Sequence, residues 1–350
     1  MQDNVTIIPI DTLQRAHPYA KEFFLAMGLK EVIGHLTAQQ IISGLNDDFI
    51  EGCGLGRTQM LQHFIEFIHK MNDLRTAPGP EAQSLTIIGG SDKSGRRENV
   101  NMTIESGEIV CVVGLTGSGK SRLLADIECL AQGDTPTGRR ILINGVVPDH
   151  EKRFAIEHKL VAQLSQNMNF VVDVSVSEFI AMHAESRLND DVEKTTERII
   201  TCANELAGEP FDLNTPVTQL SGGQSRALMI ADTALLSPLP IVVIDEIENA
   251  GVDRRKALNL LVKEEKIVLM STHDPLLALM GGRRIVIRNG GISAVIKTSD
   301  REQNTLEELY RIDRCLMGLR DRIRTGGVID FDMKEYFGFN GYIIGENACC

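Results

Sequence analysis

Gly-Leu-Thr-Gly-Ser-Gly-Lys-Ser, at residues 114–121, is the stretch that decides the predicted fold of this chain. The apolar run before it, residues 107–113, suits a buried parallel strand, and the residues after it, 122–130, have helical spacing. A strand, a glycine loop and a helix in this order form the context of a phosphate-binding loop. Glycines let backbone N–H groups turn inward on an anion, and the helix N-terminus adds unpaired N–H groups. The pattern therefore favours an anion site over a glycine-rich turn with a solvated lysine.

The anion predicted for this loop is the phosphate chain of a nucleotide. Lys120 is expected to contact the β- and γ-phosphates, and the Ser121 hydroxyl is expected to ligate Mg²⁺. The predicted nucleotide contacts of this stretch are Gly114, Leu115, Thr116, Gly117, Ser118, Gly119, Lys120, Ser121 and Arg122.

A second apolar run, Ile-Val-Val-Ile at residues 241–244, ends in Asp245 and Glu246. In an open α/β sheet, a carboxylate at the carboxyl end of a strand lies beside the phosphate loop. Asp245 is the candidate for holding Mg²⁺ through water, and Glu246 is the candidate general base for the attacking water. Taken alone, Asp-Glu after a strand is more often the start of a loop. Its place downstream of the phosphate loop favours a catalytic role.

Two further stretches, Leu-Ser-Gly-Gly-Gln at residues 220–224 and Ser-Thr-His-Asp at residues 271–274, complete a set of four. In their order and separations the four stretches resemble the ATP-binding cassette (ABC) ATPases, over about residues 84–298. The resemblance implies an α/β P-loop fold with a mixed sheet core and a helical subdomain. It also implies an ATP hydrolase that uses Mg²⁺.

The resemblance assigns roles to a histidine and a glutamine. His273 follows the apolar run Ile-Val-Leu-Met, and in the family a histidine here contacts the γ-phosphate and the catalytic water. Gln166 is the first choice for the family's glutamine loop, which senses Mg²⁺. Gln163 is the alternative, and either residue can instead be a polar loop residue.

The stretch Ser221, Gly222, Gly223 and Gln224 is a second anion cradle, because a hydroxyl and glycine N–H groups precede a helix-like run. In the family this signature faces the γ-phosphate held by the opposite subunit. The chain has one copy of each element, so the resemblance implies a homodimer or a heterodimer with a related cassette. The alternative is an ordinary Ser/Gly helix cap.

The sequence departs from the family pattern in two places. Between Leu74 and Val113 it has no aromatic residue to stack on adenine, and the candidates to cover the base are Ile87, Ile88, Arg96 and Arg97. After Glu246 it reads Ile-Glu-Asn-Ala-Gly-Val-Asp, one residue longer than the Pro-Thr-Ser-Ala-Leu-Asp of a transporter-like cassette. Asp253 is expected to fill the final aspartate role at the dimer interface.

The predicted domains are a helical N-terminal domain, a linker, the cassette, and a C-terminal helical extension with a tail. They span residues 1–75, 76–83, 84–298 and 299–350, and the helical subdomain of the cassette spans about 170–218. Faintly, the first domain resembles small helical domains appended to redox and metal-cofactor proteins of anaerobes, and a partner-docking domain is the alternative. Short helices are predicted over 17–28 and 58–71.

Near the C-terminus, an apolar seam either packs on the cassette or pairs with a helix of another chain. Its residues are Leu309, Ile312, Leu316, Leu319 and Ile323. The terminal Cys349 and Cys350 are read as a frayed end, with a metal-handling or thiol tail as the alternative.

Composition narrows the cellular setting. The net charge of −12 argues against a nucleic-acid partner. No apolar run is long enough to cross a bilayer, no secretory leader is recognised, and the seven cysteines lack paired metal-ligand spacing. We expect a reduced, cytoplasmic protein, peripheral to the inner face of the membrane if it serves a transporter.

The sequence leaves the client of the ATPase open. The unusual segment after Glu246 and the extra helical domain favour conformational work on a soluble metalloenzyme, in the assembly or activation of a metallocofactor. The alternative is the ATP-binding subunit of a membrane ABC transporter with a separate permease. A third possibility, a translation or DNA-associated binding module, is disfavoured by the single cassette and the acidic charge.

Overall fold

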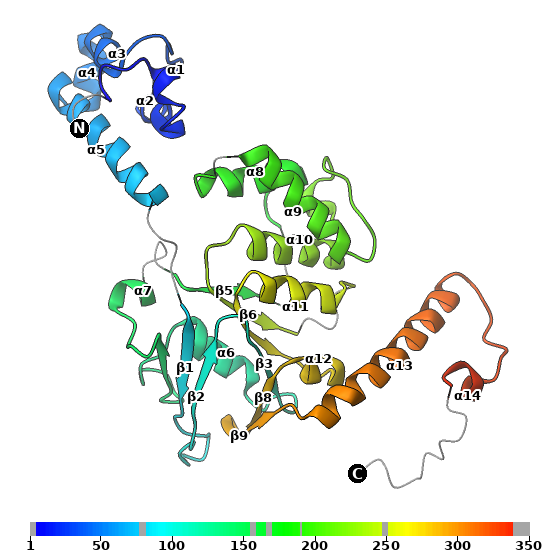
Figure 1. The fold of residues 1–350 in the computed structure, drawn as a ribbon. Helices are drawn as coiled ribbons and strands as arrows, with labels where there is room; N and C mark the ends of the chain where they lie inside the picture. Colours follow the sequence, from blue (N-terminus) through cyan, green and yellow to red (C-terminus); the bar gives the residue numbers. More distant parts are fainter. Residues whose placement is uncertain are drawn as a thin grey trace. The chain divides into compact units, whose positions relative to one another are not determined.

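The computed structural model describes residues 5–76, 82–154, 159–165, 170–189, 191–246 and 251–338. The chain divides into two compact units, Met1–Gly79 and Pro80–Cys350 (Figure 1). Gln166, Cys349 and Cys350 lie outside the described residues, so their predicted roles stay predictions.

The N-terminal unit is helical. Its elements are α1 (Ile10–Leu13), η1 (Pro18–Ala20), α2 (Glu22–Ala26), α3 (Ala38–Gly44), α4 (Asp47–Cys53) and α5 (Arg57–Thr76). The single helix predicted over 17–28 is wrong in detail, because a 3₁₀ turn beginning at Pro18 precedes a short helix. Gly28 then has φ +97°, a left-handed conformation that ends the helix.

Aromatic side chains from α2 and α5 form the core of this unit. Phe24 and Phe64 are fully buried, and their ring centroids lie 5.3 Å apart. Phe23 contacts both rings edge-on at 5.3 Å. Offset and edge-to-face contacts at these distances stabilise aromatic clusters beyond the area that they bury.

The second unit contains two sheets. A three-stranded antiparallel sheet has the order β2 (Asn101–Glu105), β1 (Ser84–Ile88), β4 (Arg140–Ile143). The six-stranded sheet has the order β5 (Val161–Leu164), β6 (Ile241–Asp245), β7 (Ile267–Ser271), β3 (Ile109–Val113), β8 (Arg283–Arg288), β9 (Gly291–Lys297). Its strands are parallel except β9, which pairs antiparallel with β8. The prediction of a mixed α/β sheet is confirmed.

Ten helices of the second unit are described. They are α6 (Lys120–Glu128), α7 (His150–Phe154), α8 (Val176–Ser186), α9 (Val192–Leu206), η3 (Val217–Gln219), α10 (Gly222–Leu235), α11 (Arg254–Lys263), α12 (Pro275–Met280), α13 (Asp300–Arg324) and α14 (Met333–Tyr336).

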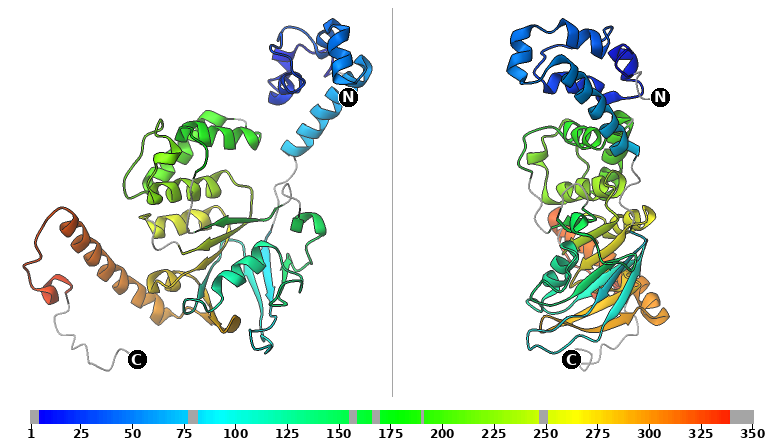
Figure 2. Two further views of the ribbon diagram at one scale, coloured as in Figure 1. Left: turned by 180° about the vertical axis from the view of Figure 1, so that it is seen from behind. Right: turned by 90° about the vertical axis from the view of Figure 1, so that its left-hand side faces the viewer.

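The six-stranded sheet separates two apolar cores because strand side chains alternate between its faces. Val110 and Val112 pack with α6 and the small sheet, whereas Cys111 between them packs with the helices α8 to α11. Figures 1 and 2 show the helices α8 to α11 on one side of the sheet and the small sheet on the other. Burial on both faces explains why these strands read as continuous apolar runs.

The predicted apolar seam of α13 is covered only in part. Leu319 is buried, whereas Leu316 is 41% exposed and Ile323 is 59% exposed. Ion pairs attach the start and the middle of the helix to the cassette, from Arg284 to Glu302 and from Arg254 to Asp313. Among the described residues, no helix is both long enough and apolar enough to cross a membrane.

We predict that Phe64→Ala destabilises the N-terminal unit by about 3–5 kcal/mol, because removing a buried aromatic ring leaves a cavity. Hydrogen exchange should accelerate across residues 5–76 and stay unchanged in the strands of the cassette. His63→Ala, on the exposed face of α5, is the matched control. Unchanged exchange in α2 and α5 of Phe64→Ala would contradict this assignment of the core.

Candidate functional site

The predicted phosphate loop lies between β3 and α6, as its sequence context requires. Lys120 is the first residue of α6, and its side chain is folded back over the loop. The Nζ atom donates to the carbonyl of Gly114 at 2.9 Å and lies 3.5 Å from that of Leu115. With 9% of its surface exposed, the ammonium group is held at the loop, where a bound phosphate would compete for its N–H groups.

Close backbone approach explains two glycines of the loop. Gly119 has φ +111°, and a Cβ atom there would lie 2.9 Å from the Cα of Gly290. Gly114 has φ +155°, and a Cβ atom there would lie 2.6 Å from the carbonyl oxygen of Ile287. The loop therefore rests against the end of β8 and the turn that follows it.

The donors of the loop fit a bound anion. The Ser118 hydroxyl is buried and has no hydrogen-bond partner within the described part of the chain. An unpaired buried hydroxyl is costly, and a phosphate oxygen or a water molecule would satisfy it. Thr116, Gly117 and Ser121 are exposed, so a ligand can reach them.

The strand register brings the predicted catalytic groups to the same edge of the sheet. Asp245 is paired with Ser271 across β6 and β7, and Ser271 is paired with Val112 across β7 and β3. The Ser271 hydroxyl donates a hydrogen bond to Asp245 Oδ1, which fixes the orientation of that carboxylate. The ends of β6, β7 and β3 thus place Asp245, His273 and the phosphate loop in adjacent positions.

Glu246, the candidate general base, has an unusual backbone conformation. Its φ of +50° lies in the left-handed region, which non-glycine residues seldom adopt and which stores strain at functional sites. Two hydrogen bonds hold it there. Its N–H donates to the Ser271 carbonyl at 3.3 Å, and its carbonyl accepts from Arg226 Nη1 at 3.0 Å.

Arg226 is a residue that the sequence reasoning missed. It lies on α10, two residues after Gln224, and is 4% exposed. Besides Glu246, its guanidinium donates to the carbonyl of Ser165 at 3.1 Å. One buried cation therefore joins the signature helix to the base and to the end of β5. The available signal was an arginine directly before the apolar run Ala-Leu-Met-Ile-Ala at residues 227–231, because a charge at a buried position requires partners.

His273 is exposed at the end of β7, immediately after Thr272. The Thr272 N–H donates to the carbonyl of Val112 at 3.1 Å, which attaches this turn to the strand that leads into the phosphate loop. Asp274 caps α12 by accepting from the Leu276 N–H at 2.8 Å, and it also pairs with Arg254. These contacts suit the predicted contact of His273 with the γ-phosphate and the catalytic water, which stays a prediction.

The signature stretch caps α10. The Ser221 hydroxyl accepts from the Gln224 N–H at 3.3 Å, and the Gln224 side chain accepts from the Ser221 N–H at 2.9 Å. Both residues also line a groove of about 1470 Å³, bounded by residues 251–256 and by α13. None of the described residues that line this groove belongs to the phosphate loop, residues 114–121. Within one chain, the signature and the phosphate loop therefore do not share this groove.

The structure also places the residues at which the sequence departs from the family pattern. Ile87 is fully buried within β1, so its proposed role in covering the base is wrong. Arg96 is exposed and binds Asp92 through Nε at 3.2 Å. Asp253 caps α11 through the Lys256 N–H at 3.1 Å. Gln163, the alternative glutamine, lies in β5 rather than in a loop.

The residues fit a magnesium ion that is held mainly by water and phosphate. Among the described residues, no group of three His, Cys, Asp or Glu side chains forms a ready cage for a metal. Mg²⁺ retains several water molecules and typically takes one or two protein oxygens together with substrate phosphates. Ser121 and Asp245 supply such oxygens, and Gln166, the third predicted ligand, lies outside the described residues.

Comparisons with known proteins agree on one family. A family model described as ABC transporter matches residues 97–249. An uncharacterized ABC transporter ATP-binding protein of Methanocaldococcus jannaschii is 53% identical over 247 residues, 70% of this chain and 94% of the relative. The macrolide export ATP-binding/permease protein MacB of Psychrobacter cryohalolentis is 31% identical over 224 residues, 62% of this chain. This match covers 33% of MacB, so the chain spans about a third of that relative.

A solved structure shares the fold. CbiO1 of Clostridium perfringens, described as part of the ABC transporter complex CbiONQ, superposes with a TM-score of 0.50 and 21% identity. The superposition covers 66% of this chain and 94% of that one, which supports the P-loop cassette architecture.

We predict that Lys120→Ala weakens ATP binding at least about tenfold, because the loop loses its charged phosphate contact. Fluorescence titration with an ATP analogue measures the affinity. Lys159→Ala, which removes an exposed ammonium 3.6 Å from Glu128, should leave the affinity unchanged. Equal affinities for Lys120→Ala and the wild type would remove Lys120 from the site.

Proposed function

Because this chain is a member of the ATP-binding cassette (ABC) ATPase family, an ATP-binding ATP hydrolase, we propose that it is the ATP-binding subunit of a membrane transporter with a separate permease. In this proposal two cassettes form a dimer, and two ATP molecules, each with Mg²⁺, bind at the interface between the cassettes. The observation that carries it is the 53% identity to an ABC transporter ATP-binding protein, 94% of which the match covers.

The hydrolysis proposed for the site follows from its groups. The phosphate loop and Lys120 hold the triphosphate, while Mg²⁺, held by Ser121, Asp245 and water, would neutralise charge on the phosphates. Glu246 removes a proton from the attacking water, which adds to the γ-phosphorus as the bond to the β-phosphate oxygen breaks. His273, at the end of the neighbouring strand, contacts the γ-phosphate side.

The separate groove of the signature supports the proposed dimer. Ser221 lines a groove that the phosphate loop of its own chain does not line, so a nucleotide on that loop needs the signature of a second chain to be enclosed. In a head-to-tail dimer of two copies, or of one copy with a related cassette, each chain supplies its signature to the nucleotide bound by the other chain. The two nucleotides then stabilise the dimer, and hydrolysis weakens it.

The size of the M. jannaschii relative supports a permease on another chain. That protein extends little beyond the matched cassette, whereas MacB combines its ATP-binding and permease parts in one chain. These relatives favour a transporter over the metallocofactor role expected from the sequence, for which they give no support. The work of the dimer would then be done at the inner face of the membrane, on the permease.

We predict that Glu246→Gln slows hydrolysis about 10²–10⁴-fold and stabilises an ATP-bound dimer, because the base is lost and the phosphate contacts remain. Turnover assays and light scattering with Mg²⁺ and ATP measure both effects. Glu265→Gln is the matched control, because Glu265 is an exposed glutamate with a similar φ of +54°. A variant that binds ATP, does not turn over and stays monomeric would contradict the dimer proposal.

The partner is tested by purifying the tagged protein from detergent-solubilised cells and identifying what co-isolates in the presence of ATP. The proposal predicts a polytopic membrane protein, whose presence stimulates the ATPase in lipid vesicles. Co-isolation of a stoichiometric soluble metalloenzyme that is activated by the ATPase would overturn the transporter role. It would favour the role in metallocofactor assembly or activation instead.

A further inference from the structure

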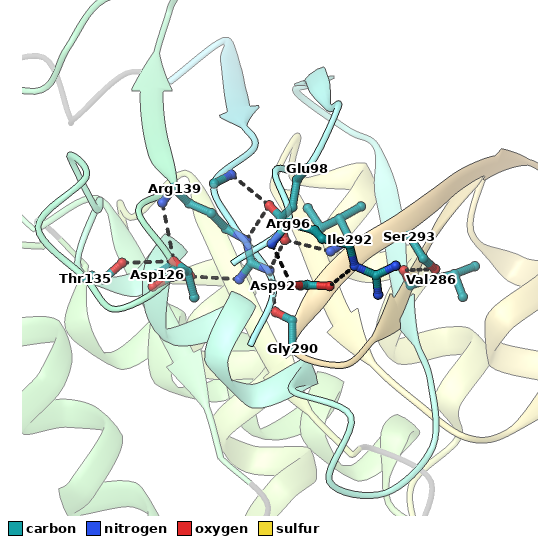
Figure 3. A network of polar contacts seen from close by, with 12 residues as sticks. Asp92, Arg96, Glu98, Asp126, Thr135, Arg139, Val286, Gly290, Ile292 and Ser293 are labelled. Atoms are coloured by element: carbon teal, nitrogen blue, oxygen red, sulfur yellow. Dashed lines mark hydrogen bonds and ion pairs between the residues drawn. The ribbon is translucent and has the colours of Figure 1, made fainter. Parts of the chain in front are cut away.

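Among the described residues outside the four sequence stretches, Arg139 has the largest fully buried side chain, with none of its surface exposed. Arg139 immediately precedes β4. Its Nε and Nη2 atoms donate to the two oxygens of Glu98 at 3.0 and 2.6 Å. Nη1 donates to Asp126 Oδ2, and Nη2 donates to the carbonyl of Gly290, both at 2.9 Å (Figure 3).

These partners connect segments that are distant in sequence. Asp126 lies on α6, the helix that begins at Lys120. Gly290 lies in the turn between β8 and β9. Glu98 also accepts hydrogen bonds from the N–H groups of Gly90 at 2.9 Å and Ile292 at 2.7 Å. A single cation therefore ties α6, the β8–β9 turn and the loop before β2 to one point.

The β8–β9 turn is in direct contact with the phosphate loop. The Gly290 N–H donates to the carbonyl of Ser118 at 2.7 Å, and Gly119 leaves room for no side chain against Gly290. In a trans peptide the carbonyl and the following N–H point in opposite directions. Fixing the Ser118 carbonyl toward the turn therefore aims the Gly119 N–H to the opposite side.

We infer that Arg139 is a positioning residue for the phosphate-binding loop. It holds the Gly290 turn against Ser118 and Gly119 of the loop and, through Asp126, holds the helix that begins at the next residue, Lys120. The loop N–H groups and Lys120 are thereby oriented before nucleotide arrives, so binding costs less ordering entropy. This inference rests on ATP binding at residues 114–121.

The electrostatics of the cluster support a permanent charged network. Burial raises the pKa of Glu98, but the hydrogen bonds from Arg139 and from the Gly90 and Ile292 amides more than offset it, so this pKa lies below its ordinary value. Burial lowers the pKa of Arg139, and the contacts with Glu98 and Asp126 raise it above the ordinary value. The contacts therefore stay charge-assisted, which makes them strong and directional.

The test compares Arg139→Met with a buried cation away from the loop. Lys266 is 7% exposed, and its Nζ donates to the carbonyls of Ser237 at 2.7 Å and Leu239 at 3.0 Å. It precedes β7, at the edge of the sheet opposite the phosphate loop. Both Arg139→Met and Lys266→Met are expected to lower the melting temperature, because each leaves buried polar groups unpaired.

Only Arg139→Met should also weaken nucleotide binding. We expect the Kd for an ATP analogue and the KM for ATP to rise roughly tenfold or more in this variant, and to stay unchanged in Lys266→Met. Glu98→Gln, a milder change to the same cluster, should raise Kd less, and it replaces Arg139→Met if that variant does not fold.

Wild-type affinity and KM in the folded cluster variants, despite a lowered melting temperature, would overturn the inference and leave Arg139 with a purely structural role. Failure of the wild-type protein itself to bind ATP would instead contradict the proposed function. The two failures are therefore distinguishable in the same titration.

Discussion

The parallel pairing of β6, β7 and β3 is the constraint on which the rest of the structure depends. It sets Asp245, Ser271 and Val112 side by side, although helices and loops separate them in the sequence. Since parallel strands end at one edge, the phosphate loop, the carboxylates and His273 all follow from this register. A shift of one residue would turn Asp245 to the other face of the sheet and separate it from Ser271.

The signature helix is joined to this edge by buried charge rather than by the sheet. Arg226 on α10 binds the carbonyls of Glu246 and Ser165. A movement of the signature helix would therefore displace Glu246, the candidate general base, and the end of β5. Arg139 acts similarly on the phosphate loop from the small sheet. Two guanidiniums thus orient loops that the strands alone leave adjustable, since planar guanidinium donors fix geometry as well as charge.

Much of the fold and part of the site could be predicted from the sequence. The runs 109–113, 241–244 and 267–270 are apolar throughout because both faces of the sheet are covered, and this signal is strong. The glycines of the loop are equally informative, because close backbone approach excludes side chains at Gly114 and Gly119.

The remaining features depend on tertiary contacts. Hydropathy treats Arg139 and Arg226 as surface residues, and only their buried carboxylate and carbonyl partners explain their positions. The left-handed backbone of Glu246 has no local sequence signature. The sequence alone left Ile87 as a candidate to cover the adenine base. In the structure it lies in β1 and is part of the core. The roles assigned to the motif residues stay predictions until they are measured.

The central claim is that each ATP molecule is held by two chains, and the ATPase rate per chain as a function of protein concentration tests it most directly. The account predicts that the rate per chain falls on dilution below the dimer dissociation constant, and that Ser221→Arg abolishes turnover while ATP still binds. A rate per chain that stays constant across dilution and is unaffected by Ser221→Arg would contradict it.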